Sequence, residues 1–220
     1  VTLCGSELAE YEFSTSELGT PTDGCSVTGR TYQVDLVGAR FIAPVSIAEL
    51  LMGQVGDELV FSATSQTSGS IEWMSGGGAE GVQDECVETV SWPRSSWSDP
   101  HFRLGPEDAE LHLAGLDVVV SDLAFAATLG SDCASYGGGM LTGEIDARVV
   151  APLLVDLLGI SDPDEFCATM TGFGVTCLPC GADGEPYCIP LDIRDVSATA
   201  TSGAIEEISA ADVAGNSSCP

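Results

Sequence analysis

Cysteine supplies most of the chemistry that this sequence offers. The nine cysteines lie at positions 4, 25, 86, 133, 167, 177, 180, 188 and 219. So many cysteines in a chain of 220 residues are typical of an oxidising compartment, in which thiols pair as disulfides. We therefore expect at least three disulfides. Because nine is an odd number, at least one cysteine must stay free, be modified or pair with another chain.

We expect one long-range disulfide and one locally paired group. The long-range bond that we predict joins Cys25 to Cys86, and in the chain-entropy model the loop that it closes stabilises the fold by about 4 kcal/mol. The local group is expected to pair internally and consists of Cys167, Cys177, Cys180 and Cys188.

The local group allows two other chemistries. One is a four-cysteine zinc site, because the spacing Cys177-Leu178-Pro179-Cys180 lets two thiolates hold one tetrahedral ion. The other is a redox pair of the thioredoxin type, which needs an exposed thiolate at the start of a helix that follows a strand. Here the glycine-rich stretch 181–186 follows instead, and then Cys188. Zinc would also leave the other five cysteines unexplained, so disulfides are the favoured interpretation.

Signatures of catalysis are scarce. The only histidines are His101 and His112, and the alternation around His112 turns its side chain toward solvent. His101 lies close to Asp99, but the chain has no Gly-x-Ser-x-Gly elbow or comparable nucleophile motif. The glycine runs 76–78 and 137–139 lack the lysine of a phosphate-binding loop. We predict no catalytic, cofactor-binding or metal-ligating residue, and a protein that is not an enzyme.

Calcium is the one ion that the sequence leaves open. Asp162, Asp164 and Glu165 lie within four residues, and Asp183 is followed closely by Glu185, so oxygen ligands are available for a hard cation. The chain has no twelve-residue EF-hand loop. The favoured interpretation of the first cluster is a helix start, because acidic residues in the first turn interact well with the helix dipole.

Acidic residues dominate the charge. The chain has 34 Asp and Glu against six Arg and no Lys, which gives a formal net charge of −28. Six scattered arginines cannot neutralise a run of phosphates, so nucleic acid and anionic membrane surfaces are excluded as partners. The hydrophobic content of 44% is too high for a disordered acidic chain. We interpret the acidic residues as a solvated coat on a globular protein.

Alternating apolar residues predict several strands. The first half contains strands at 32–36, 58–63 and 70–74, with the glycines 76–78 as a break after the last. Between the first two strands, Ser46-Ile47-Ala48-Glu49 forms a capping box that starts a helix.

The second half begins with apolar positions whose phase slips twice between residues 110 and 129. Because strand side chains alternate with a period of two, each slip indicates a turn or a bulge, at Ala114-Gly115 and at Ser121-Asp122. Asp162 and Pro163 mark a helix start, and Gly172 ends that helix. The remaining elements are two strands and one further helix, expected at 141–145, 189–194 and 149–158.

These elements predict an α+β fold. It would be mainly an antiparallel β-sheet with two or three helices that cover one face, stapled by disulfides. We expect a single extracytoplasmic domain over residues 1–220. Segments 39–44 and 147–152 are alike, so a duplication is an alternative. Duplication would produce two related halves and an irregular segment that joins them, at about residues 25–85, 100–200 and 86–101.

Glycine and cysteine patterns in the second half resemble a known group of proteins. The stretches concerned are Phe102-Arg103-Leu104-Gly105-Pro106-Glu107-Asp108, the run Ala114-Gly115-Leu116-Asp117-Val118, the block from Gly137 to Arg148, and Cys177-Leu178-Pro179-Cys180 with Asp183-Gly184 and Tyr187-Cys188. Over roughly residues 25 to 200 the chain resembles uncharacterised secreted or lipid-anchored envelope proteins of myxobacterial type. The resemblance implies export and disulfides, and it implies no activity.

These observations favour a noncatalytic structural or interaction protein of the cell envelope or cell surface, in an extracytoplasmic location. We expect the tail 210–220 to be held by a disulfide of Cys219 or by neighbouring subunits, which favours a subunit of a larger extracellular assembly. The partners would be proteins or further copies of the chain. No stretch approaches the roughly 18 apolar residues of a membrane helix, so no transmembrane segment is expected. The alternative is a module of the periplasm or outer membrane that binds a ligand, glycan or lipid.

The charge predicts how salt affects stability. A folded surface of about 9,500 Å² places net charges about 18 Å apart. The screening length is about 30 Å at 0.01 M salt and about 8 Å at 0.15 M, so repulsion within the coat acts only at low salt. We expect the melting temperature to rise smoothly with NaCl. A step of several degrees at sub-millimolar calcium, reversed by a chelator, would contradict this and point to Asp162, Asp164 and Glu165.

Overall fold

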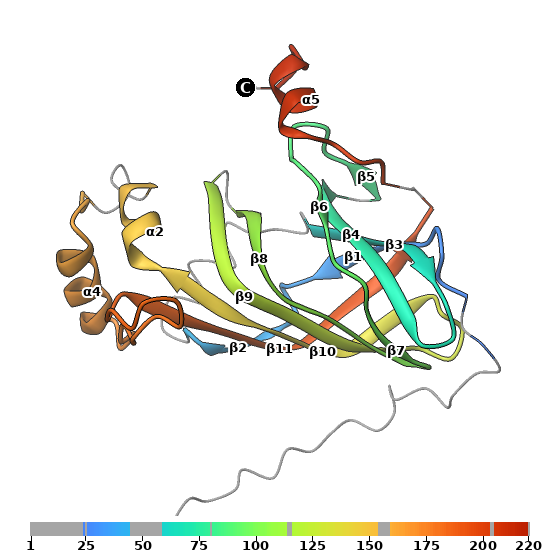
Figure 1. Ribbon diagram of the computed structural model, residues 1–220, viewed down its shortest axis with the longest axis horizontal. Coiled ribbons are helices and arrows are strands. Elements are labelled where there is room, and N and C mark those ends of the chain that lie inside the picture. Colours follow the sequence, from blue (N-terminus) through green and yellow to red (C-terminus); the bar gives the residue numbers. More distant parts are fainter. Residues whose placement is uncertain are drawn as a thin grey trace, which may run out of the picture.

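The computed structural model describes residues 24, 26–44, 59–79, 81–113, 116–153, 159–202 and 205–219. Strands form most of this part of the chain (Figure 1). They are β1 (Thr31–Asp35), β2 (Arg40–Ala43), β3 (Leu59–Gln66), β4 (Ser70–Ala79), β5 (Val82–Gln83), β6 (Val90–Ser91), β7 (Ser95–Ser98), β8 (His101–Leu113), β9 (Leu116–Leu129), β10 (Ser135–Asp146) and β11 (Cys188–Thr201). The helices are α2 (Ala147–Leu153), α4 (Pro163–Gly172) and α5 (Ala210–Gly215).

Eight of the strands form a closed antiparallel barrel. Neighbouring strands follow the order β1-β3-β4-β7-β8-β9-β10-β11, and β11 pairs with β1 again. Thr31 on β1 is therefore the partner of both Ser62 on β3 and Thr201 on β11. The three other strands attach outside this ring, β2 to β11 and both β5 and β6 to β4.

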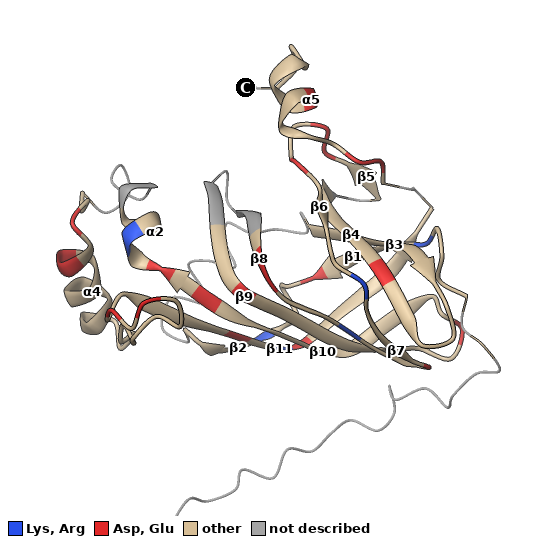
Figure 2. Cartoon of the chain, in the orientation of Figure 1, with Lys and Arg blue, Asp and Glu red and all other residues tan. Residues whose placement is uncertain are grey.

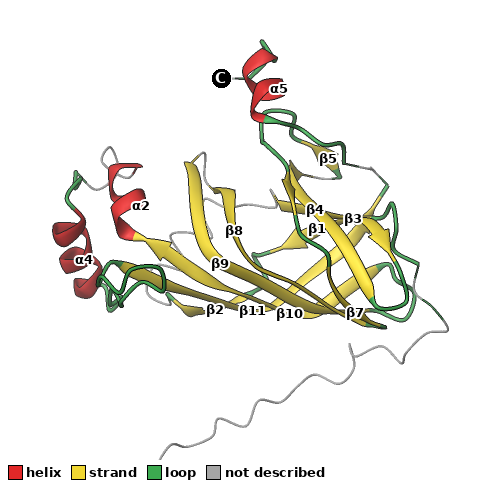
Figure 3. Cartoon of the chain, viewed as in Figure 1, coloured by secondary structure: helices red, strands yellow, loops and turns green. Residues whose placement is uncertain are grey.

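The predicted α+β class is wrong, because the sheet closes on itself. A closed sheet buries its inner face against its own strands, so it needs no layer of covering helices. The helices α2 and α4 lie at one end of the barrel (Figure 3). There α2 buries Ala147, Val150 and Ala151, and α4 buries Phe166 and Met170.

Aromatic rings fill part of the barrel interior. Tyr32, Trp73, Phe102, Phe125 and Tyr136 are each at most 4% exposed and come from five different strands. Neighbouring ring centroids in this aromatic cluster lie 4.8 to 5.9 Å apart. Each such ring buries about 150–250 Å², so the cluster contributes a large share of the apolar area that stabilises the fold.

The bulge predicted at Ser121-Asp122 is confirmed. The register of β9 shifts by one residue at this point against both β8 and β10. Asp122 adopts a φ of +50°, and its backbone N–H donates to Asp108 Oδ1 over 3.1 Å. The bulge bends β9, which helps a long strand to follow the curved wall of the barrel.

Most of the predicted strands are confirmed, and several are longer than predicted. Helix α4 begins at Pro163 and ends at Gly172, as the sequence predicts. The predicted break at glycines 76–78 is wrong, because these residues continue β4. A methyl group on Gly77 would lie 2.8 Å from the Val87 side chain, so glycine there allows close packing.

Two further predictions need correction. The segment 86–101 is not wholly irregular, because it contains β6 and β7. Segments 39–44 and 147–152 differ in structure, since the first contains strand β2 and the second lies in helix α2, so the structure gives no support to a duplication. The helix predicted from Ser46 lies outside the described residues, and the helix predicted over 149–158 is described as far as Leu153.

The C-terminal segment is fastened to the loop between β5 and β6. Cys219 forms a disulfide with Cys86, 133 residues away. Ile208 exchanges backbone and side-chain hydrogen bonds with Thr89, which aligns the two segments. The predicted bond between Cys25 and Cys86 is therefore wrong, while the expectation that a disulfide of Cys219 holds the tail is confirmed.

Gly105 and Gly138 provide a matched test of the barrel wall. Both have positive φ, +71° and +58°, but a methyl group on Gly105 would lie 2.2 Å from the Leu123 carbonyl oxygen, whereas Gly138 faces open space. Alanine at Gly138 should cost about 1–2 kcal/mol, from backbone conformation only. Gly105→Ala should cost at least twice as much, because β8 and β9 must separate locally. Urea denaturation, monitored by tryptophan fluorescence, measures the free energy of unfolding of both variants. Equal losses of this free energy would contradict the close contact at Gly105.

Candidate functional site

The four clustered cysteines are bonded in two pairs. Cys167 is bonded to Cys177, and Cys180 is bonded to Cys188. The expected internal pairing of this group is therefore present, and the Cys86–Cys219 bond brings the described disulfides to three. Cys133 is also disulfide-bonded, to a partner that lies outside the described residues. Three disulfides indicate an oxidising, extracytoplasmic environment.

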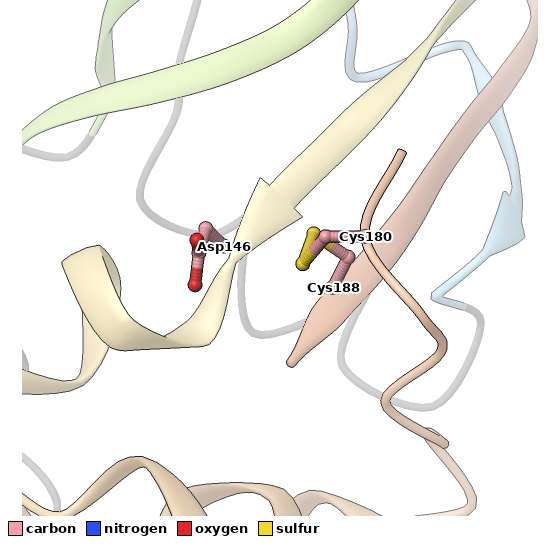
Figure 4. Close-up of side chains that lie close together, drawn as sticks. All are labelled: Asp146, Cys180 and Cys188. Carbon is pink, nitrogen blue, oxygen red and sulfur yellow. A yellow bond between two sulfur atoms is a disulfide. The ribbon is translucent and has the colours of Figure 1, made fainter. Parts of the chain in front are cut away.

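Three residues of types that can ligate a metal lie close together at the end of β10. Asp146, Cys180 and Cys188 place a carboxylate oxygen and two sulfur atoms within 4.8 Å of one another (Figure 4). The two sulfurs are bonded to each other, so neither is a thiolate, and a thiolate is the form of cysteine that binds metal. The zinc alternative fails at these four cysteines for this reason.

Arg148 organises the same corner of the molecule. Its Nε lies 2.9 and 3.0 Å from the two carboxylate oxygens of Asp146, and its Nη2 donates to Asp146 Oδ2 over 2.6 Å. Its Nη1 donates to Asp183 Oδ2 over 2.7 Å. Nη2 also lies 3.8 Å from Cys180 Sγ. We call Arg148 with its partners Asp146 and Asp183 the arginine clasp, because it joins the start of α2 to the loop 177–188.

The loop is held from three further directions. The Arg148 guanidinium lies 5.2 Å from the centroid of the Tyr187 ring, a cation–π contact. The Tyr187 hydroxyl donates to Asp164 Oδ1 on α4 over 2.9 Å. The backbone N–H of Gly181 donates to Glu144 Oε2 over 3.0 Å. Strand β10 and the two helices α2 and α4 are therefore all tied to one short loop.

The pKa values at the clasp follow from these contacts. The hydrogen bond from Arg148 lowers the pKa of the Asp146 carboxyl, and it is the largest cause of the lowered pKa of Asp183. The same bonds raise the pKa of Arg148. The hydrogen bond to Asp164 raises the pKa of Tyr187. All of these groups keep their ordinary charge near neutral pH, so the clasp is a structural ion-pair network rather than an acid–base pair.

Three of the acidic residues considered for calcium, Asp162, Asp164 and Asp183, already accept hydrogen bonds from the protein. Asp162 caps α4, and its carboxylate accepts hydrogen bonds from the backbone N–H groups of Asp164 and Glu165. Asp183 binds Arg148 and also accepts from the backbone N–H of Glu185. The helix-start interpretation of the first cluster is confirmed.

Within the described residues, His101 contacts no candidate catalytic partner. His101 is exposed, and its Nδ1 lies 2.8 Å from Thr128 Oγ1. The side chain of His112 lies outside the described part. Sequence reasoning missed the clasp, because Arg148 and Asp183 are 35 residues apart and no local pattern joins them.

Comparison of the chain with protein-family models, with curated proteins and with solved structures finds no match. Within the described ranges, no helix is long and apolar enough to span a membrane.

The clasp predicts an acid-dependent contribution to stability. Because the folded pKa values of Asp146 and Asp183 lie below the ordinary value, this contribution is present above about pH 4 and is lost as the pH falls through the lowered values. Arg148→Gln should therefore lower the urea midpoint at pH 6 to 8. The difference in urea midpoint between this variant and the native chain should become smaller below pH 4.

Arg94→Gln is the matched control. Arg94 pairs with Glu72 on the surface, where an ion pair contributes about 0–1 kcal/mol. At pH 6 to 8, Arg94→Gln should therefore lower the urea midpoint by less than Arg148→Gln does. If the difference in urea midpoint between Arg148→Gln and the native chain stayed constant down to about pH 2, that result would contradict the role assigned to the clasp.

Proposed function

We propose that this protein is a noncatalytic structural or interaction protein of the cell envelope or cell surface, and that it acts through its outer surface as a subunit of an extracellular assembly. Its place would be the periplasm, the outer membrane surface or the extracellular space. The resemblance of residues 25 to 200 to envelope proteins of myxobacterial type supports the same proposal.

The packing of large side chains inside the barrel is the observation that carries the proposal. An eight-stranded barrel is just wide enough either to be filled by side chains or to hold one small ligand. Here the rings of the aromatic cluster are in contact, and Leu104, Leu123 and Leu129 beside them are at most 1% exposed. An interior that is occupied by side chains supports a role for the outer surface.

Covalent and ionic fastening of the irregular segments supports the same role. The described disulfides hold the C-terminal segment, helix α4 and the loop 177–188. Loops held in one conformation lose little entropy on binding, which favours recognition of a partner.

The surface charge indicates what partner would fit. Acidic residues are spread over strands, helices and loops, with few arginines among them (Figure 2). A partner with a basic surface would be steered toward such a coat, and this attraction would weaken as salt rises.

One observation favours the alternative of a ligand-binding module. Trp73 Nε1 and the Tyr136 hydroxyl are buried in the aromatic cluster, and neither has a hydrogen-bond partner among the described residues. Ligand sites are typically apolar and aromatic, with a few polar groups that orient the ligand.

Native mass spectrometry of the protein, isolated from its source without reductant, tests the proposal. We expect the disulfide-bonded chain in a stoichiometric complex with a protein partner or with further copies of itself. The complex should dissociate as NaCl is raised if the acidic coat makes the contact. A chain that is monomeric at every salt concentration would contradict the proposal.

A further inference from the structure

Two polar groups inside the barrel lack the hydrogen bonds that buried polar groups normally form. Trp73 is 1% exposed and Tyr136 is 2% exposed. The indole Nε1 of the first and the hydroxyl of the second have no hydrogen-bond partner among the described residues. Buried polar groups in folded proteins are nearly always bonded to protein or to ordered water, because an unbonded group keeps the full cost of leaving water.

The two groups belong to one connected set of rings. The Tyr32 centroid lies 5.9 Å from that of Trp73 and 5.4 Å from that of Tyr136. The Phe102 centroid lies 4.8 and 5.5 Å from the same two rings. Trp73, Phe102, Tyr136 and Tyr32 therefore form a closed circuit of contacts, in which Tyr32 and Phe102 each contact both of the residues that carry an unbonded group.

The rings of this circuit do not satisfy the two groups themselves. Phe102 has no polar atom. The Tyr32 hydroxyl donates to the Cys133 carbonyl oxygen over 2.9 Å, and it forms no hydrogen bond with Trp73 Nε1 or with the Tyr136 hydroxyl. Elsewhere the barrel does satisfy a buried indole, since Trp92 Nε1 donates to Ser75 Oγ over 2.9 Å. A third buried atom without a partner among the described residues, Asp99 Oδ1, lies in the turn between β7 and β8, so Trp73 and Tyr136 are the two such residues of the aromatic cluster.

The surroundings limit the charge and the size of anything that binds there. The buried polar residues of the described core are Thr31, Ser62 and Ser75, and none of them is charged. Burial raises the pKa of Tyr32 to about 12 and raises that of Tyr136 as well, so both hydroxyls stay protonated at physiological pH. The rings around the two groups have centroids 4.8 to 5.9 Å apart, so we infer that a guest between them is small.

We propose that the aromatic cluster encloses a small neutral guest, which accepts a hydrogen bond from Trp73 Nε1 and forms a second hydrogen bond with the Tyr136 hydroxyl. Water and a neutral organic molecule of a few heavy atoms share this chemistry. The inference goes beyond the surface role proposed above, and it deepens the ligand-binding alternative, because both use the unbonded groups of Trp73 and Tyr136.

Tyr136→Phe is the main test, because it removes the hydroxyl and keeps the ring. If the hydroxyl binds a guest, the melting temperature should fall by about 2–4 °C, as expected for the loss of one hydrogen bond in a chain of this size. Tyr32→Phe is the matched control, since it removes a hydroxyl with a known partner from the same cluster and should cause a similar fall. An unchanged or raised melting temperature for Tyr136→Phe would overturn the proposal.

Two direct measurements on the full, disulfide-bonded chain identify the guest. A stoichiometric mass excess in native spectra, absent from Tyr136→Phe, would show a small organic molecule. A long-lived water cross-peak to the Trp73 indole N–H in NMR spectra, assigned with the Trp73→Phe variant and lost in Tyr136→Phe, would show water. The absence of both signals would overturn the proposal whatever the melting temperatures.

Discussion

Strand β1 closes the barrel, and the interior depends on this closure. Its residues Thr31 to Gln33 pair with β3 on one side, and Thr31 to Asp35 pair with β11 on the other. Without β1, β3 and β11 would each present an unpaired edge, which is a common route to unwanted association of sheets. Closure also brings Tyr32 into the barrel, where its ring meets Trp73 and Tyr136. The same few residues thus remove the sheet edges and complete the core.

The loop between β9 and β10 is fastened by this strand as well. The Cys133 carbonyl oxygen accepts hydrogen bonds from the Tyr32 hydroxyl and from Arg30 Nη1, both over 2.9 Å. One carbonyl therefore links the start of β1 to a loop about 100 residues away in the sequence. This link orients the Tyr32 ring within the aromatic cluster.

At the end of the molecule that carries α2 and α4, ion pairs and disulfides stabilise the structure, whereas the barrel is stabilised by packing. The arginine clasp and the Cys180–Cys188 disulfide hold the loop 177–188 against β10 and α2. A partly exposed ion pair contributes little by itself, but bidentate geometry and a shared arginine make this network stronger than an isolated surface pair. In an acidic protein with six arginines, the use of one of them between two aspartates also relieves local repulsion.

Local patterns in the sequence determined the elements whose causes are local. The alternation of apolar residues located β1, β9, much of β3, the first half of β4, the end of β8 and part of both β10 and β11, and its phase slip located the bulge at Asp122. The Asp162 cap, Pro163 and Gly172 defined α4, because capping acts within a few residues. The pairing inside the cysteine group was also predictable, since its members are only 8 and 10 residues apart in each bond.

Only the tertiary structure decided which distant segments meet. The pairing of β1 with β11, the Cys86–Cys219 bond and the bond from Arg148 to Asp183 join residues that no short pattern connects. Antiparallel strands with the same alternation can form an open sheet under helices or a closed barrel, and the difference lies in one additional pairing. That pairing depends on the curvature of the whole sheet, which the long strands and the bulge at Asp122 create together once they are folded.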